Sequence, residues 1–166
     1  SDLYVTGTIW DEVDFNPDPA STYNLGCSLC SSAYVLQLDS SGDFGWAVVF
    51  EHLSYGFGVA AALGGAAVYV TGSFSGTVDF DPNPDETDNL TSEYQYDSFV
   101  VKLDAGELVW AKSFAGPSAG AYNSALNSGH SVGFDNSGNV YVYGRFFGTV
   151  DFDPDPDETY NLTSEY

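Results

Sequence analysis

The chain contains very few basic residues. Only three of its 166 residues are Lys or Arg, against 24 Asp and Glu, so the formal net charge is −21. Binding to nucleic-acid phosphates needs clustered Lys and Arg, and anionic membrane surfaces attract the same cationic side chains. The sequence also lacks the run of about 20 apolar residues that a membrane-spanning helix needs. We therefore expect no nucleic-acid partner and no membrane insertion.

Cysteine and histidine are also scarce. Cys27 and Cys30 form a C-x-x-C pair, and the two histidines, His52 and His130, lack metal-ligand spacing relative to this pair and to each other. A zinc site would need two more ligands, and a thioredoxin-like motif would need a βαβ context. We interpret the pair as incidental, and as a local disulfide if the protein is extracellular. A functional thiol is the alternative.

The most informative feature of the chain is an internal repeat. Residues 69–94 return at residues 141–166 with five differences, and a more divergent copy begins at Tyr4. The copies start at Tyr4, Tyr69 and Tyr141, so the spacings are 65 and 72 residues. Both ends of the chain fall inside a copy, which suggests a window from a longer array or a processed chain. Function must therefore be argued from the repeat unit.

Each full copy is predicted to contain four short antiparallel strands, a to d. In the middle copy, strand b covers residues 68–80 with a kink at Gly76, strand c residues 98–103 and strand d residues 108–114. In the last copy, strand a covers residues 130–134. The alanine-rich segment 59–63 has high helix propensity, but it aligns with strand a, so we expect essentially no helix.

The predicted fold class is all-β, with tandem four-stranded antiparallel β-propeller-like blades. The expected repeats are residues 1–58 (strands b-c-d), residues 59–129 (strands a-b-c-d and a following loop) and residues 130–166 (strands a-b). In residues 98–103, apolar side chains point to both faces, which is typical of a sheet packed between two others. These blades are too few to close a ring alone. Other copies would complete the ring, or the blades would stack openly.

Three stretches carry a family resemblance: NVYVYGRFFGTVDFDP, DSFVVKLDAGELVWAKSF and SVGFDNSGNVYVYG. They resemble the bacterial β-propeller repeat family known as SBBP, and the resemblance covers nearly the whole chain. It implies an extracellular or cell-surface repeat protein of β-propeller type. It implies no particular activity.

Fourteen of the 24 acidic residues fall in three short loops, residues 11–18, 79–88 and 151–158. Asp or Asn recurs there at every second position, and proline stiffens the backbone between them. Alternate side chains of an extended backbone share a face, so we expect their oxygens to converge on a cation. Calcium prefers six to eight oxygen ligands and is the predicted ion. The predicted ligands are Asp14, Asn16 and Asp18; Asp79, Asp81, Asn83 and Asp85; and Asp151, Asp153, Asp155 and Asp157.

The alternative interpretation is a solvated acidic loop that binds no ion specifically. The first loop carries fewer charges, with Ala20 where the other loops have Asp85 and Asp157, so we expect it to have the lowest calcium affinity. Directly after the second and third loops, Asn89 and Asn161 begin N-L-T sequons. These are candidate glycosylation sites. The alternative is an asparagine turn before a strand.

The sequence favours a non-enzyme. The acidic residues recur in every copy, whereas acid–base catalysis needs one site with two differently tuned acids. We predict a non-catalytic extracellular structural module that calcium stabilises and that assembles with copies of itself into a surface layer or filament. The alternative is a fragment of a carbohydrate- or protein-binding β-propeller adhesin, with the variable residue Trp10 as a candidate contact. A glycan-active enzyme is the third hypothesis.

Overall fold

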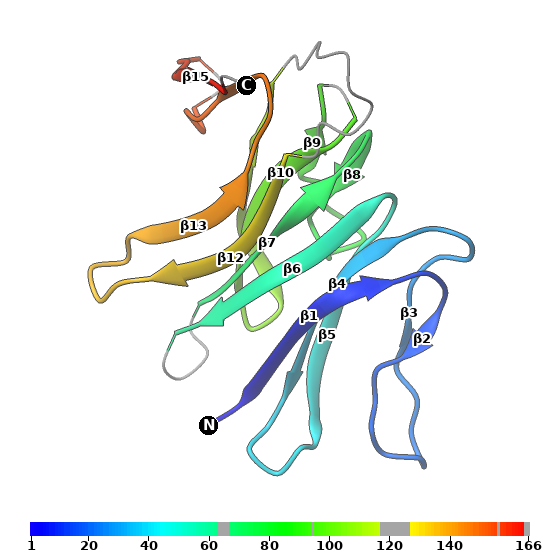
Figure 1. The fold of residues 1–166 in the computed structure, drawn as a ribbon. Helices are drawn as coiled ribbons and strands as arrows, with labels where there is room; N and C mark the ends of the chain where they lie inside the picture. Colours follow the sequence, from blue (N-terminus) through cyan, green and yellow to red (C-terminus); the bar gives the residue numbers. More distant parts are fainter. Residues whose placement is uncertain (63–66, 94, 117–126, 156, 165–166) are drawn as a thin grey trace.

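Three antiparallel sheets follow one another along the chain (Figure 1). The computed structural model describes residues 1–62, 67–93, 95–116, 127–155 and 157–164. The described residues form strands and contain no helix, so the expected all-β fold class is confirmed. None of the described sheets closes on itself. No helix that could cross a membrane is present in this part of the chain.

The central sheet contains all four strands of the middle repeat. Its order is β11-β10-β7-β6, which is the expected order d-c-b-a. Strand β6 begins earlier than the position of the alanine-rich segment predicts. The expected turn at Gly64 and Gly65 lies outside the described residues. The strands are β6 (Ser54–Ala61), β7 (Val68–Phe74), β10 (Asp97–Asp104) and β11 (Glu107–Phe114).

The flanking sheets contain the strands that the repeat alignment predicts for them. The first sheet has the order β1-β4-β5, and the third sheet pairs β12 with β13. These correspond to strands b-c-d and a-b. The strands are β1 (Leu3–Ile9), β4 (Ser32–Leu38), β5 (Phe44–Phe50), β12 (Ser128–Phe134) and β13 (Val140–Arg145).

Three two-stranded ribbons accompany the sheets, one for each copy of the repeat. They pair β2 (Val13–Asp14) with β3 (Asn24–Leu25), β8 (Thr77–Asp79) with β9 (Asn89–Thr91), and β14 (Thr149–Asp151) with β15 (Asn161–Thr163). The expectation of one long kinked strand over residues 68–80 is therefore wrong. Gly76 has a φ of +73°, which ends β7, and its N–H donates to Ser92 Oγ at 2.7 Å. The chain then leaves the sheet and pairs with β9 instead.

The main hydrophobic core lies between the first and the central sheet. Val35 and Phe50 from the first sheet pack there against Val70, Phe99 and other fully buried residues of the central repeat. On the opposite face of the central sheet, Tyr69 packs against Val132 of the third sheet. The central sheet is thus covered on both faces, as its apolar pattern predicts.

The phenylalanine that follows the first strand of the middle ribbon packs into this core. Phe80 is fully buried between Phe50 of the first sheet and Phe99 of the central sheet, with ring centroids 5.2 and 4.8 Å away. The ribbon is thereby anchored between two successive sheets. Its acidic loop projects from this anchor.

Candidate cation-binding loops

Each ribbon carries one of the three acidic loops, and all three loops have the same internal hydrogen bonds. In the middle loop, Asp79 Oδ1 accepts the backbone N–H groups of Asp81 at 3.0 Å and Asp88 at 2.9 Å. Asp81 Oδ1 accepts from the N–H of Asn83, and Asn83 Oδ1 from the N–H of Asp85. Every second side chain therefore folds back onto the amide two residues ahead, which is an Asx turn.

The outer two loops repeat this pattern. Asp14 Oδ1 accepts from the N–H groups of Asn16 (3.0 Å) and Tyr23 (2.8 Å). Asp151 Oδ1 accepts from those of Asp153 (2.9 Å) and Tyr160 (2.7 Å). The two backbone hydrogen bonds lower the pKa of Asp14, because they stabilise its charged form. The ladder continues through Asn16 and Asp18 in the first loop and through Asp153, Asp155 and Asp157 in the third.

The carboxylates of a loop lie further apart than the sequence pattern suggests. Among the described residues, no three carboxylates of these loops have oxygen atoms within 4.8 Å of one another. The Asx turns direct one oxygen of each side chain to the backbone and leave the second carboxylate oxygen for another partner. The donor set consists of hard oxygen ligands and so suits calcium. A cation that binds several of these oxygens would draw the loop side chains closer together.

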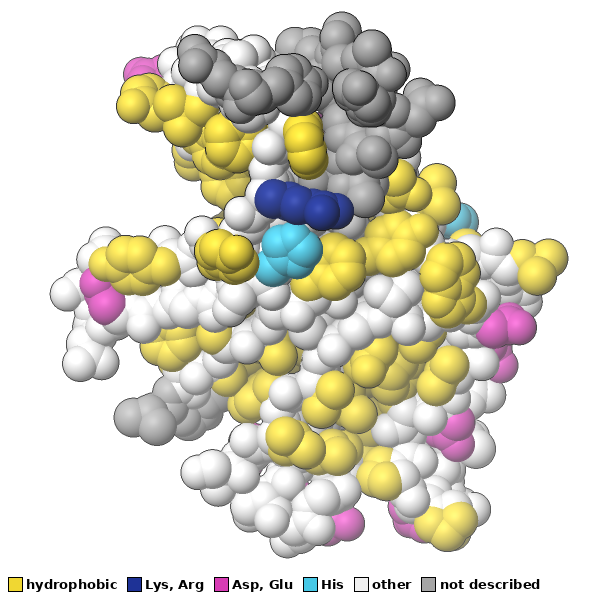
Figure 2. Space-filling view, viewed as in Figure 1, with side chains coloured by type: hydrophobic (Ala, Val, Ile, Leu, Met, Phe, Trp, Pro, Cys, Tyr) yellow, Lys and Arg dark blue, Asp and Glu magenta, His cyan; other side chains and the backbone are white. Residues whose placement is uncertain are grey.

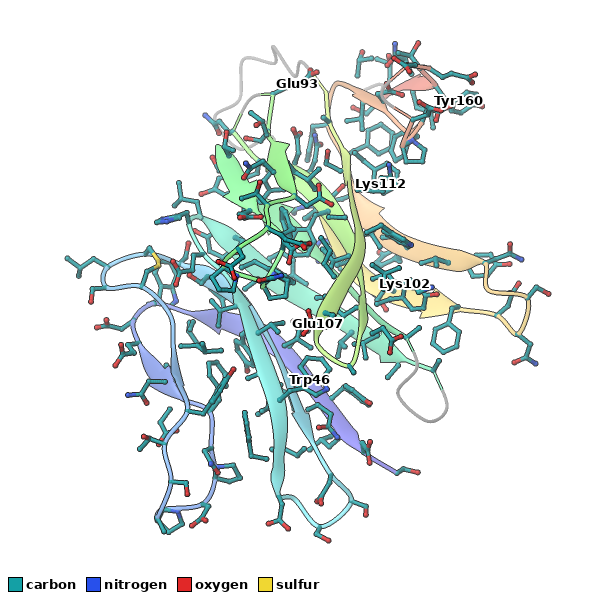
Figure 3. The ribbon with its side chains drawn as sticks, turned by 180° about the vertical axis from the view of Figure 1, so that it is seen from behind. Trp46, Glu93, Lys102, Glu107, Lys112 and Tyr160 are labelled. Atoms are coloured by element: carbon teal, nitrogen blue, oxygen red, sulfur yellow. A yellow bond between two sulfur atoms is a disulfide. The ribbon has the colours of Figure 1, made fainter. Side chains whose placement is uncertain are left out.

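The middle loop lies beside a groove. Asp79, Asp81 and Asn83 are half-buried and line a cavity of about 760 Å³ together with Trp46 and Glu107, which Figure 3 labels. Strand β5 and the turn between β10 and β11 supply the opposite wall. In the first loop, Asp14 and Asp18 are exposed. The equivalent residues of the third loop, Asp151 and Asp153, are half-buried like those of the middle loop.

A cysteine pair and a histidine come together at the end of the first sheet. Cys27 and Cys30 form a disulfide, and the side chain of His52 lies close enough that its nitrogen and the two sulfurs are within 4.8 Å of one another. Sequence spacing gave no indication of this, because the β4–β5 hairpin returns residue 52 to the cysteines. The disulfide occupies both thiols, so this state offers no thiolate ligands.

The two candidate glycosylation residues are exposed. Asn89 begins β9 and Asn161 begins β15, so each lies in a ribbon strand opposite an aspartate, Asp79 or Asp151. Their exposed positions leave the side chains accessible to modification. Glycan attachment at Asn89 and Asn161 stays a prediction.

Aromatic side chains form two short rows, and each row includes one residue of β6. In Figure 2, hydrophobic side chains (yellow) lie beside a histidine (cyan) on the face of the molecule that is in view. Trp10, 66% exposed, lies 6.1 Å from Tyr55, and Phe57 lies 5.7 Å from His130 (ring centroids). The rows are completed by Tyr96 beside Tyr55 and Tyr143 beside His130. By contrast, Trp46 and Trp110 are half-buried against the core clusters.

Two β-bulges place the rings of the second row. Gly56 and Gly58 pair with adjacent residues of β7, so Phe57 has no cross-strand partner there. Strand β12 has the same irregularity around His130. A bulge redirects the side chain of its extra residue. Equivalent bulges in two successive repeats thus put Phe57 and His130 next to each other.

A buried aspartate links the central sheet to the third repeat. Asp97 is 1% exposed and accepts hydrogen bonds from the N–H of Glu93 (2.8 Å) and Asn127 Nδ2 (3.3 Å). Asn127 Oδ1 in turn accepts the N–H of Phe147. Burial raises the pKa of Asp97, and the hydrogen bonds only partly offset this. Sequence reasoning missed this pair, which holds the two repeats together.

Comparison of the chain with protein-family models, curated proteins and solved structures found no match. The resemblance to the SBBP repeat family therefore stays a prediction, carried by the repeat sequence alone.

Proposed function

We propose that the chain is a non-catalytic extracellular structural module whose acidic loops bind calcium. In this proposal, the sheets are propeller-like blades of a larger assembly at a cell surface or in a filament. The observation that carries the proposal is the threefold recurrence of one acidic loop with the same hydrogen bonds on the same ribbon. Recurrence in every repeat favours a structural role over a single catalytic site.

Electrostatics supply the reason for an ion. Fourteen acidic residues lie in the three loops of a chain with a net charge of −21. The carboxylates within each loop therefore repel one another, and so do the three loops. Bound calcium would neutralise part of this charge at the anchor between successive sheets. In the middle loop, Asp79, Asp81, Asn83 and Asp85 would supply side-chain oxygens. The disulfide between Cys27 and Cys30 is compatible with an oxidising, extracellular location.

Thermal unfolding in calcium and in chelator tests this proposal. We expect calcium to raise the melting temperature, because binding to the folded state contributes about 2.7 kcal/mol at a free concentration of 100 times Kd. Magnesium at the same concentration serves as a control for general charge screening. A melting temperature that is the same in calcium, magnesium and chelator would reject the calcium part of the proposal. Electron microscopy with and without chelator tests the assembly.

The two aromatic rows support a second candidate function, binding of carbohydrate as part of an adhesin. Exposed rings such as Trp10 (66%) and Tyr143 (73%) are suited to stacking against the apolar faces of sugars. Binding of soluble oligosaccharides, measured by calorimetry, tests this function. The variant Trp10→Ala should lose the binding, whereas Leu29→Ala, at an exposed residue outside the rows, should retain it. Equal binding by both variants would reject the row of Trp10, Tyr55 and Tyr96 as the binding site.

A further inference from the structure

The first repeat has a cysteine where the other two repeats have a serine that stabilises the ribbon. In the second repeat, the N–H of Gly76 donates to Ser92 Oγ at 2.7 Å, and in the third, the N–H of Gly148 donates to Ser164 Oγ at 2.8 Å. Cys27 holds the equivalent position in the first repeat. Sulfur is a weak acceptor of hydrogen bonds. The cysteine thus replaces a good structural acceptor, which indicates a role for its sulfur outside the fold of the repeat.

The second cysteine also departs from the repeat. Cys30 aligns with Gln95, so the second repeat forms its sheet without either sulfur. The Cα atoms of Cys27 and Cys30 are 5.7 Å apart, and the yellow bond in Figure 3 joins their sulfurs. C-x-x-C is also the spacing with which two thiolates bind one ion in structural zinc sites. In its reduced form, the pair therefore offers two zinc ligands.

The fold brings a third ligand to the pair. Ala33 pairs with Phe50 in the β4–β5 hairpin, so the segments before Ala33 and after Phe50 leave the first sheet side by side. Two hydrogen bonds connect these segments, from the N–H of Ser54 to Ser31 O at 3.3 Å and from the N–H of Ala33 to Ser54 Oγ at 2.8 Å. His52 lies in the second segment, and its ring nitrogen and the two sulfurs are within 4.8 Å of one another.

These distances suit a zinc ion. Zinc lies about 2.3 Å from a thiolate sulfur and about 2.0–2.1 Å from an imidazole nitrogen, so its tetrahedral ligand atoms are about 3.6–3.8 Å apart. Small rotations of the side chains bring the three atoms to this separation once the disulfide opens. His52 has a φ of +69°, in the left-handed region that histidine adopts more readily than most other residues.

A buried hydroxyl group contacts both sulfurs. Ser32 is fully buried, and its Oγ lies 3.3 Å from the sulfur of Cys27 and 3.3 Å from that of Cys30. Within the part of the chain that the structure describes, these two sulfurs are its hydrogen-bond partners. A charged thiolate accepts a hydrogen bond more strongly than a neutral sulfur does. Ser32 therefore favours the thiolate form and is placed to orient the metal ligands.

We propose that Cys27, Cys30 and His52 bind a zinc ion when the disulfide is reduced. A dithiol reductant opens the disulfide by thiol–disulfide exchange: it forms its own disulfide, and its two electrons and two protons convert Cys27 and Cys30 to thiols. Zinc then replaces the two thiol protons, which are released to solvent, and the neutral imidazole of His52 supplies the third ligand atom. Water takes the fourth position. Oxidation of the pair closes the site and releases the ion.

The bound ion would link two connections of the chain. The cysteines lie between β3 and β4, whereas His52 lies between β5 and β6, where the chain passes from the first sheet to the central sheet. Zinc would therefore strengthen the junction between the first two repeats. Thiolate and imidazole ligands prefer zinc, whereas the carboxylates of the acidic loops prefer calcium, so the two kinds of site select different ions.

Cobalt is the spectroscopic probe for this site. The full chain is reduced with a phosphine, which offers no thiolate to the metal, and is titrated with Co²⁺ without oxygen and in excess calcium, which competes for the acidic loops. We expect one Co²⁺ per chain, with a thiolate-to-cobalt charge-transfer band and the strong visible bands of tetrahedral cobalt. Equimolar Zn²⁺ should displace most of the cobalt. The oxidised chain should give neither band.

Three variants identify the ligands. Cys27→Ser should fold, because serine is the residue of the other two repeats at this position, and it should bind cobalt at least tenfold more weakly. His52→Asn removes the imidazole and retains a residue that tolerates the left-handed backbone, and it should also weaken binding at least tenfold. His130→Asn is the matched control at the other histidine and should bind cobalt like the unsubstituted chain. Far-UV circular dichroism verifies the fold of each variant.

Two results would overturn the proposal. One is the absence of a charge-transfer band in the reduced chain. The other is an equal cobalt affinity of His52→Asn and His130→Asn, because the cysteines would then bind the metal without His52. The test is independent of the calcium proposal: a cobalt band with calcium-independent melting would reject the calcium sites alone, and calcium-dependent melting without a cobalt band would reject the zinc site alone.

Discussion

The ring centroids of Phe50 and Phe80 lie 5.2 Å apart, and this contact joins strand β5 of the first sheet to the ribbon of the next repeat. Both side chains are fully buried, so the contact is part of the core that holds the first two sheets together. Phe80 also lies within the middle acidic loop, residues 79–88, so the contact anchors this loop to the core. Phe80 thereby links core packing to the candidate cation site, because it lies between the predicted ligands Asp79 and Asp81.

We expect Phe80→Ala to lower the free energy of unfolding by about 3–5 kcal/mol, the usual cost of removing a buried phenylalanine. Urea unfolding at neutral pH measures the change. The equivalent variant Phe152→Ala is a matched control, because Phe152 is only half-buried. Its loss should be smaller, because less apolar surface is removed from water there, and equal losses would show that burial does not determine the cost.

The sequence predicted the strands of the sheets well because the repeat provides an internal alignment. The order of the central sheet and the absence of helix in the alanine-rich segment, within the described residues, both follow from it. The ribbon was missed because β-branched residues continue past Gly76 without a break in pattern. Only the left-handed backbone of Gly76 ends the strand there.

The candidate sites were less predictable than the strands. Spacing in the sequence identified the alternating Asp and Asn residues, but the Asx turns that hold them depend on backbone geometry. The proximity of His52 to the disulfide and the Asp97–Asn127 pair both join residues that are distant in sequence. Such contacts depend on how hairpins and sheets pack, and a single sequence contains no local signal for them.

Gly129 tests the close approach of the central and third sheets. A Cβ on Gly129 would lie 1.9 Å from Thr71 Oγ1 and 3.1 Å from Thr71 Cβ. Thr71 is fully buried and its hydroxyl donates to Phe99 O at 2.7 Å, so it has little freedom to move. We expect Gly129→Ala to destabilise the protein by about 1–3 kcal/mol, as overpacking does.

The control for this variant lies on the same strand. A Cβ on Gly133 would meet no atom within 4 Å, so Gly133→Ala should change the free energy of unfolding little. Thermal and urea unfolding of the two variants provide the comparison. Similar losses in both would show that strand propensity, rather than the contact with Thr71, determines the effect.

Two substitutions of Asp79 separate the charge of the middle loop from its hydrogen bonds. Asp79→Asn retains an oxygen that can accept from the N–H groups of Asp81 and Asp88, whereas Asp79→Ala removes it. We expect Asp79→Ala to cost about 1–3 kcal/mol in the absence of calcium, because two half-buried amides lose their acceptor. Asp79→Asn should cost less.

Calcium titration of the same variants gives the complementary result. Calorimetry should detect weaker binding for Asp79→Asn than for the unsubstituted chain, since a carboxylate ligand has been replaced by a neutral amide. The equivalent change in the first loop, Asp14→Asn, should alter total calcium binding less, because that loop has the lowest predicted affinity. Unchanged binding in Asp79→Asn would show that the charge of Asp79 does not contribute to calcium binding.

The buried carboxyl group of Asp97 predicts a specific dependence of stability on pH. Burial raises its pKa in the folded state above the ordinary value of 3.8, so the folded protein holds this proton more tightly than the unfolded chain. The stabilisation from the protonated form is complete below pH 3.8 and is lost as the pH rises through the folded-state pKa. Above that pKa, the contribution of Asp97 is constant.

Asp97→Asn removes this titration while keeping the shape of the side chain. The variant can lose some stability at every pH, because its amide group meets the N–H of Glu93 or the Asn127 side chain that donates to Asp97. The readout is therefore the pH dependence. From pH 3 upward, the unsubstituted protein should lose stability relative to Asp97→Asn until the folded-state pKa is passed. Urea unfolding at pH 3 and from pH 5 to 8 avoids the isoelectric region near pH 4.1. If the free energy of unfolding of the two proteins has the same dependence on pH, the pKa of Asp97 is not raised. Carboxyl-carbon NMR of the folded protein would then measure this pKa directly.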